Sequence, residues 1–301
     1  MILLIDTNPI LETRLRGDSF AKGATSSVQE KRMAPAGYGA RMAKLASNIN
    51  ESAKLMTFLG GSAGERYEKL ISLSGTDVVV KAIRDETKER LILEEKNRMS
   101  TLETPEPRLT REDMVDFYEG FLKEAAASEV VVLAKSTRKE DPEAMKLPLV
   151  RYARKLSKPV IMLAESNDDP EETREARPFG IVVERDVLGE LLDKPMNFLG
   201  DIVQGLDKLY GGDIPLILVT GSERGSILYA RGSYFFAKNE EKGAHFDPHA
   251  AAVALAAGIV RKYDATMLLK LTQAAAVTET GTDFGILKGL MNKIDVQQME
   301  V

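Results

Sequence analysis

Short continuous apolar runs recur along the chain, and a segment with helical periodicity follows each of them. The apolar runs lie at residues 1–6, 54–61, 128–136, 158–166, 179–185 and 214–222. Runs without polar alternation are typical of strands buried on both faces, as in the interior of a parallel sheet. The helical patterns lie at residues 37–48, 62–73, 110–127, 141–156, 186–192, 199–210, 248–262, 267–276 and 286–293. This alternation predicts an α/β fold, a three-layer sandwich with a mostly parallel central sheet and helices on both faces.

Two regions break the alternation. Residues 76–96, "TDVVVKAIRDETKERLILEEK", alternate polar and apolar positions around a charged turn, which favours a pair of antiparallel strands. Residues 11–34 are polar and extended. We predict that both segments form a small β-lid projecting from the main sheet. Because no internal repeat or low-complexity linker divides the chain, residues 1–301 are expected to form one domain.

Composition indicates a globular protein with a sizeable core, since 44% of the residues are hydrophobic and 29% are charged. The net charge of −5 provides no general attraction to nucleic acid or to anionic membranes. The chain has no cysteine, which excludes disulfides and thiolate metal sites and fits a reducing compartment. The apolar start at residues 1–5 is too short for a signal sequence, and no stretch approaches the roughly 20 apolar residues that cross a bilayer. We therefore expect a cytoplasmic protein without nucleic-acid or membrane partners.

One helix start has the features of a phosphate site and of a well-capped structural helix at once. In "HFDPHAAAVALAAGIV" (245–260), Asp247 is a good N-cap and Pro248 suits the first helical position. A helix N-terminus presents unpaired N–H groups and partial positive charge, so it can bind phosphate. Phosphate-binding turns are usually rich in glycine, whereas this one has none. The segment is therefore either a site or the remnant of one.

Five motifs in order along the chain resemble those of one enzyme family. They are "DTNPILE" (6–12), "PAGYGARMAKLAS" (35–47), "FLGGSAGERYEKLIS" (58–72), "ETKERLIL" (86–93) and "VTGSERGSILYARG" (219–232). Together they resemble the PfkB group of the ribokinase-like carbohydrate kinases, most closely the branch of 1-phosphofructokinase and tagatose-6-phosphate kinase. The resemblance implies a ribokinase-like fold and transfer of the γ-phosphoryl group of ATP to a sugar hydroxyl, with Mg²⁺. It also implies lids that commonly pair into dimers.

The resemblance assigns site residues by position. On the substrate side it implies Asn8, Glu12, Gly37, Gly39, Arg41, Lys88 and Arg90. On the nucleotide side it implies Thr220, Ser222, Gly225 and Asp247. The three cations among these residues could hold a sugar phosphate or another small anion beneath the lid. A solvated basic hairpin explains the two lid cations equally well.

The central catalytic motif of the family is altered. The G-A-G-D sequence, whose glycines present N–H groups to phosphate and whose Asp is the base, falls on residues 246–249. Both glycines are absent, Pro248 contributes no N–H, and His249 stands at the base position. As an N-cap, Asp247 would occupy the N–H groups that otherwise bind an anion. Capping therefore favours a structural helix, and the alternative is an imidazole base at His249.

Other positions depart from the family in the same direction. The sugar-binding G-G-K-G-x-N becomes residues 36–41 without its Lys and Asn, and the sugar-binding Asp becomes Glu12. The Mg²⁺-organising K-P-N-x-x-E falls on residues 182–187, with Glu184 in place of Asn. Glu184 is thus a candidate metal ligand or a solvated charge. The segment 134–140 lacks the glycine and proline of the family's S-G-S-L-P-P-G.

Two functional hypotheses remain. The first is a PfkB-type homologue that has lost phosphoryl transfer and acts as a ligand-binding, regulatory or assembly subunit. The second is a divergent ATP-dependent sugar or sugar-phosphate kinase with a non-standard base. Loss at four separate chemical positions favours the first. Mg²⁺ and ATP are expected as cofactors in the second case and need not bind in the first, and the expected partner is a second copy or an active homologue.

Overall fold

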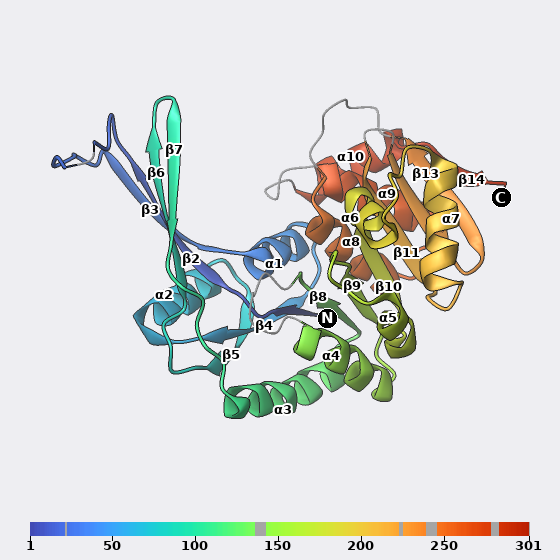
Figure 1. Ribbon diagram of the computed structural model, residues 1–301, viewed down its shortest axis with the longest axis horizontal. Helices are drawn as coiled ribbons and strands as arrows, with labels where there is room; N and C mark the ends of the chain where they lie inside the picture. The colour runs from blue at the N-terminus through green and yellow to red at the C-terminus, as the bar shows by residue number, and fades with distance from the viewer. Residues whose placement is uncertain (22, 136–142, 223–224, 239–245, 278–282, 301) are drawn as a thin grey trace.

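The main body is built on one ten-stranded sheet (Figure 1). The computed structural model describes residues 1–21, 23–135, 143–222, 225–238, 246–277 and 283–300. In spatial order the strands are β14 (Val296–Met299), β13 (Ser233–Lys238), β12 (Gly225–Ala230), β11 (Leu216–Ser222), β10 (Gly180–Glu184), β9 (Val160–Leu163), β8 (Val130–Leu133), β1 (Ile2–Asp6), β4 (Ala53–Leu59) and β5 (Asp77–Ala82). Pairing is parallel from β5 through β11 and antiparallel from β11 to β14. The predicted mostly parallel sheet is confirmed.

Helices cover both faces of this sheet, so the predicted three-layer sandwich is also confirmed. One face carries α1 (Tyr38–Asn48), α2 (Gly61–Leu73), α8 (Pro248–Val260), α9 (Ala265–Val277) and α10 (Phe284–Lys293). The other carries α3 (Arg111–Ala127), α4 (Glu143–Lys155), α5 (Pro170–Ala176), α6 (Arg185–Leu192) and α7 (Leu199–Tyr210). Successive strand residues point to opposite faces, so Leu4 joins the first core and Leu3 the second. Among the helices that the structure describes, none is both long enough and apolar enough to span a membrane.

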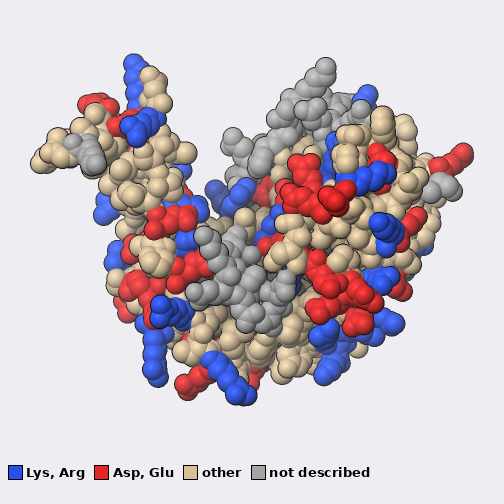
Figure 2. Space-filling model, in the orientation of Figure 1, with Lys and Arg blue, Asp and Glu red and all other residues tan. Residues whose placement is uncertain are grey.

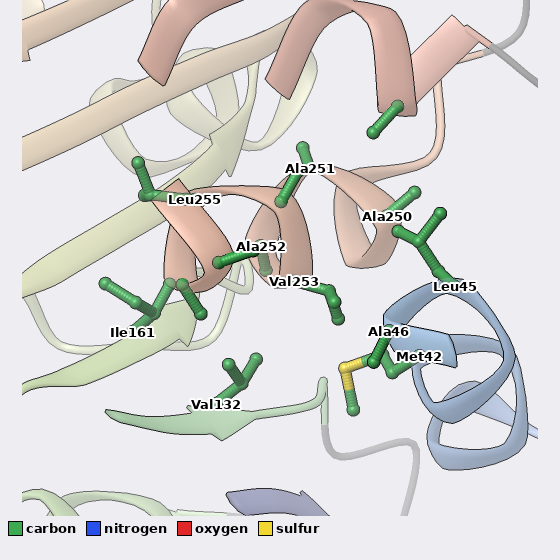
Figure 3. Close-up of a cluster of buried hydrophobic side chains, with 14 of the residues drawn as sticks. Met42, Leu45, Ala46, Val132, Ile161, Ala250, Ala251, Ala252, Val253 and Leu255 are labelled. Atoms are coloured by element: carbon green, nitrogen blue, oxygen red, sulfur yellow. The ribbon is translucent and has the colours of Figure 1, made fainter. Parts of the chain in front are cut away.

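Helix α8 lies at the centre of the first core. Its residues from Pro248 to Gly258 are all buried, as expected of a helix that is apolar around its whole circumference. Figure 3 shows Met42, Leu45 and Ala46 of α1 facing this helix, with Val132 and Ile161 of the sheet on another side. The alanines allow α1, α9 and the sheet to approach α8 closely. This packing fixes the helix N-terminus against the carboxyl ends of the strands.

A second sheet forms the lid and projects from the main body (Figure 1). Its order is β3 (Glu30–Ala36), β2 (Ile10–Arg16), β6 (Lys88–Glu95) and β7 (Arg98–Glu103). β2 and β6 pair in parallel, with Ile10 opposite Lys88, and the outer pairs are antiparallel. The predicted lid segment at 11–34 thus contains most of β2 and most of β3.

The predicted antiparallel hairpin at 76–96 is wrong. β5 does not pair with β6; it pairs in parallel with β4 and extends the main sheet. The antiparallel partner of β6 is β7, which lies beyond the predicted boundary. The sequence pattern misleads because half-buried β5 has the same short β-branched run as a lid strand, and the charged segment after it looks like a tight turn. The actual two-residue turn follows Glu95, which pairs with Arg98.

The connection from β5 to the lid is fixed to the start of α2. The Thr87 hydroxyl accepts a hydrogen bond from the Gly60 N–H at 2.9 Å and donates one to the Gly60 carbonyl at 3.1 Å. The Glu86 carboxylate accepts from the Ala63 N–H and from the Ser62 hydroxyl. These bonds satisfy N–H groups at a helix start and hold the base of the lid in one orientation.

The close packing of α8 leads to a test of stability. Ala252 is fully buried, so Ala252→Leu should lower the free energy of unfolding by roughly 1–3 kcal/mol through overpacking. Urea denaturation followed by circular dichroism measures the change. The matched control is Ala126→Leu on the exposed surface of α3, which should stay within about 0.5 kcal/mol of the original protein. Equal effects of the two substitutions would contradict the central position of α8.

Candidate functional site

The carboxyl ends of the parallel strands and the N-termini of α1 and α8 meet at one place. Ligands of open parallel α/β sheets bind at this edge. Asp6 ends β1, Glu184 ends β10, and Lys135 follows β8. Figure 2 shows the molecular surface hollowed between the lid and the main body. We call the residues gathered at the helix start, Tyr38, Arg41, Lys135, Asp247 and His249, the candidate site.

Asp247 occupies the N-terminus of α8 with its own carboxylate. Its Oδ1 atom accepts hydrogen bonds from the N–H groups of His249 at 3.0 Å and Ala250 at 3.3 Å. Its Oδ2 atom forms an ion pair with Arg41. Burial raises the pKa of Asp247, but the hydrogen bond from His249 and the charge of Arg41 outweigh burial and hold this pKa below its usual value. The sequence-based prediction of an N-cap is therefore confirmed, and the N–H groups available to an anion are already engaged.

His249 is held as a packed ring. It is 2% exposed, and its ring stacks on Tyr38 with centroids 3.7 Å apart and planes 13° from parallel. Nε2 lies 3.5 Å from the Lys135 N–H, and Nδ1 lies 3.6 Å from Asp247 Oδ1. Burial lowers the pKa of His249, although Asp247 opposes this, and the lowered pKa favours the neutral ring. Both ring nitrogens thus face protein groups, which leaves neither directed at a substrate.

Asp6 is buried beneath this layer and organises the start of α1. Its carboxylate accepts from the N–H groups of Asn8 at 3.0 Å and Gly39 at 2.7 Å. Burial raises the pKa of Asp6, against the hydrogen bonds from Asn8 and Gly39 and the influence of His249. A Cβ atom on Gly39 would lie 2.6 Å from the Asp6 Cβ atom, so only glycine permits this approach. Asn8, Gly37 and Gly39 therefore support the local backbone, whatever else they contact.

The remaining charges at the strand ends pair with one another. Lys135 forms an ion pair with Glu184. Lys146, whose side chain is 5% exposed, contacts Glu165 at 3.1 Å and Asp168 at 2.6 Å. In the described part of the chain, no three acidic or histidine side chains are grouped so that they could hold a metal ion. The described residues at this edge thus lack a protein-only metal cluster, and the Glu184 carboxylate is paired with Lys135.

The lid cations also have carboxylate partners. Lys88 contacts Glu103 at 2.9 Å and Glu106 at 3.6 Å, and Arg90 contacts Glu103 at 2.7 Å and Glu12 at 3.7 Å. Hydrogen bonds from Lys88 and then Arg90 lower the pKa of Glu103. With Arg41 paired to Asp247, each of the three cations expected to hold an anion already faces an acid. Anion binding beneath the lid stays a prediction, and these ion pairs offset the positive charge on which it depends.

The nucleotide-side positions lie along β11 and the turn after it. Thr220 is fully buried and pairs with Glu184 in the sheet, and Ser222 ends the strand. Gly225 has φ 132°, and a Cβ atom there would lie 1.9 Å from the Ala237 carbonyl oxygen. The hairpin between β12 and β13 thus requires this glycine for its own geometry. Most of the altered segment at 134–140 lies outside the described residues.

Sequence reasoning missed four members of this region: Tyr38, Lys135, Lys146 and Asp168. One signal was present for Lys135, because "VVLAK" and "IMLAE" each follow a buried apolar run with an ionisable residue, Lys135 in one case and Glu165 in the other. No comparable signal marks Tyr38, whose partner His249 lies more than 200 residues away in the sequence.

The fold is that of known sugar kinases. No protein-family model matches the sequence, and no curated protein matches it. A Staphylococcus aureus protein provisionally assigned as a phosphofructokinase has TM-score 0.87 and 14% identity over 100% of this chain and 99% of its own. Escherichia coli phosphofructokinase-2 with substrates and products has TM-score 0.79 and 14% identity (97% and 98%). Its tetrameric inhibited form has TM-score 0.82 and 12% identity (97% and 98%). A provisional Thermotoga maritima 1-phosphofructokinase has TM-score 0.76 and 15% identity (99% and 99%).

The environment of His249 leads to a pH prediction. Because its folded pKa is below the unfolded value of about 6.5, the unfolded chain binds the extra proton first as the pH falls. The contribution of His249 to the free energy of unfolding is therefore complete above pH 6.5. It declines below that pH, by at most about 1.4 kcal/mol per pH unit, until the folded pKa is reached. His249→Phe should remove this slope between pH 6.5 and 5, as measured by urea denaturation at each pH.

Two comparisons make this test specific. The chain has one other histidine, and His245→Phe should retain the slope. Asp6, with its raised pKa, contributes a dependence of opposite sign, and because His249 also acts on this pKa, the Asp6 contribution is matched only between the original protein and His245→Phe. If the slope disappears in His245→Phe and persists in His249→Phe, the assignment to His249 is wrong.

Proposed function

We propose that this chain is a non-catalytic relative of the phosphofructokinase-type sugar kinases that acts by binding, as a ligand-binding, regulatory or assembly subunit. The observation that carries the proposal is the Asp247 carboxylate at the N-terminus of α8. An anion-binding helix start must offer N–H groups to a phosphate, and here they are bonded to the protein's own anion.

The surrounding charges support the same conclusion. A phosphate approaching α8 would meet a buried carboxylate and a helix start whose first residue, Pro248, has no N–H. Arg41, the nearest cation, would have to leave its ion pair with Asp247. The Glu184 carboxylate is paired with Lys135, so a Mg²⁺ ion would have to displace a lysine. Binding of ATP in the orientation needed for transfer would thus require several ion pairs to break.

The second candidate is a divergent sugar or sugar-phosphate kinase. The observation that favours it is the likeness in fold to phosphofructokinases over nearly the whole chain, including a structure containing substrates and products. In that case His249 would have to turn out of its stack with Tyr38 to reach a hydroxyl. His249→Ala would then abolish turnover. If the chain is non-catalytic, the same substitution should leave any trace rate unchanged.

Removal of the Asp247 carboxylate tests the proposal. The original protein should show no phosphoryl transfer to fructose 1-phosphate, fructose 6-phosphate or tagatose 6-phosphate and no rise in melting temperature with Mg·ATP. Asp247→Gly exposes the N–H groups and frees Arg41, so Mg·ATP should raise its melting temperature by mass action. Thermal-shift titration and a coupled ADP assay measure the two outcomes.

A matched control is provided by α5. Asp169 caps that helix in the same way, accepting from the N–H groups of Glu171 and Glu172 with Pro170 at the first position. Asp169→Gly should lose stability without gaining a response to Mg·ATP. Rapid phosphoryl transfer by the original protein would contradict the proposal. So would an Asp247→Gly variant whose melting temperature does not rise with Mg·ATP.

We further propose that the protein is a homodimer through the lid. One lid face is mostly charged, and the other is more apolar. On the more apolar face, Met33, Leu91 and Leu102 lie in one row with Thr13, and Leu15 pairs with Leu93 in a row that also contains Lys31 and Ser100. Near the base, Leu11 packs into the core, but Leu102 is 57% exposed. A sheet face of this kind is usually covered. The E. coli neighbour has a tetrameric form.

The lid surface can be tested by charge insertion. Leu91→Asp places a carboxylate in the centre of the apolar face and should convert a dimer into a monomer, as measured by light scattering at micromolar concentration. Thr101 pairs with Ile92, the neighbour of Leu91 in β6, and successive strand residues point to opposite faces of a sheet. Thr101→Asp therefore places the same charge on the opposite face and should leave the mass unchanged. A monomeric original protein would show that the lid does not mediate dimerisation at this concentration.

A further inference from the structure

A pocket lies at the opposite end of the sheet from the candidate site. It has a volume of about 510 Å³ and apolar walls formed by Phe179, Leu216, Phe235, Ile259, Tyr263 and Leu268. This volume is in the range of small-molecule sites, roughly 300–1,000 Å³. We call it the basal pocket. It lies where α8 ends and α9 begins, about 20 Å along α8 from Asp247 at 1.5 Å per residue.

The walls of the basal pocket are apolar side chains that folding has left incompletely covered. Phe179, Phe235, Ile259 and Tyr263 pack against the main core but remain only half-buried. They belong to three separate segments of the chain: the residue before β10, β13, and the end of α8 with the turn that follows it. Convergence of apolar groups from separate elements around one concavity is typical of ligand sites rather than of scattered surface residues.

Two cations line the same pocket. Arg231 and Lys262 are both exposed, and neither belongs to an ion pair in the part of the chain that the structure describes. The one carboxylate in the lining, Asp264, accepts a hydrogen bond from the Met267 N–H at 2.8 Å and so is engaged in capping α9. Arg231 and Lys262 thus give a mostly apolar pocket a positive border, in a protein whose net charge is −5.

The backbone at both cations is unusual. Arg231 has φ 46° and Lys262 has φ 56°, in the left-handed region that glycine and asparagine favour. Arg231 is the first of the two turn residues between β12 and β13, before Gly232, a position where Asn or Gly is typical. The dipole of α8 explains a cation at Lys262, which follows the C-terminus of that helix. No helix dipole explains the cation at Arg231, which lies in a turn between two strands.

We propose that the basal pocket binds a small amphipathic anion, with an aromatic or branched apolar body and one carboxylate, sulfonate or phosphate group. The body would lie against Phe179, Phe235 and Leu268, and the anionic group would contact Arg231 and Lys262 at the border. This proposal is independent of the proposed function, because none of its residues belongs to the candidate site.

Two fluorescent probes that differ in one charged group test the proposal. 8-Anilinonaphthalene-1-sulfonate is an aromatic anion, and N-phenyl-1-naphthylamine is its uncharged counterpart. The original protein should bind one equivalent of the anion about tenfold more tightly than the neutral compound, as expected for charge-assisted contacts. The double variant Arg231→Ala/Lys262→Ala should bind the two probes equally, because it retains the apolar walls and lacks the cations. Ala265→Leu, which narrows the pocket, should weaken the binding of both.

A neighbouring basic groove supplies the control. Arg154 and Arg177 line a separate pocket that shares only Phe179 with the basal pocket. Arg154→Ala/Arg177→Ala should therefore leave both affinities unchanged. Equal binding of the two probes by the original protein, or loss of the preference only in the Arg154/Arg177 variant, would overturn the proposal.

Discussion

The N-terminus of α8 imposes the main constraint on this structure. A helix buried on every side cannot leave its first N–H groups to water, so something inside the protein must accept their hydrogen bonds. In a kinase of this fold class that acceptor could be a bound phosphate, but here it is the Asp247 carboxylate. A buried carboxylate in turn requires a cation, which Arg41 supplies. The stack of Tyr38 on His249 then closes the space above the helix start.

The same logic extends along the carboxyl edge of the sheet. Lys135 pairs with Glu184, and Lys146 pairs with Glu165 and Asp168, at the sheet edge where ligands of parallel α/β sheets bind. Buried pairs contribute less to stability than their short distances suggest, since desolvation offsets much of the attraction. Their effect is on the specificity of the arrangement, because breaking a pair leaves a buried charge uncompensated.

The sequence was sufficient for the fold because the fold depends on local patterns. Continuous apolar runs marked the parallel strands, and the Asp-Pro start marked α8. The predicted lid boundary is wrong at β5. A half-buried edge strand and a lid strand have the same alternation of polar and apolar residues, and they differ only in their pairing partner. The candidate site was harder still. The pairing of Arg41 with Asp247 joins residues 206 positions apart, and no local pattern encodes such a contact.

The construction of the lid bears on how the chain acquires its structure during synthesis. β2 and β3 emerge from the ribosome early as a hairpin, but their parallel neighbour β6 follows only after α1, β4, α2 and β5 have been made. Parallel pairing over such a separation carries a loop-closure cost that must be met before the contacts form. Until then Leu11 and Leu15 of the early hairpin lack their cover. The lid therefore completes late, and a nascent chain stalled before residue 88 exposes the two leucine side chains of a mostly polar hairpin.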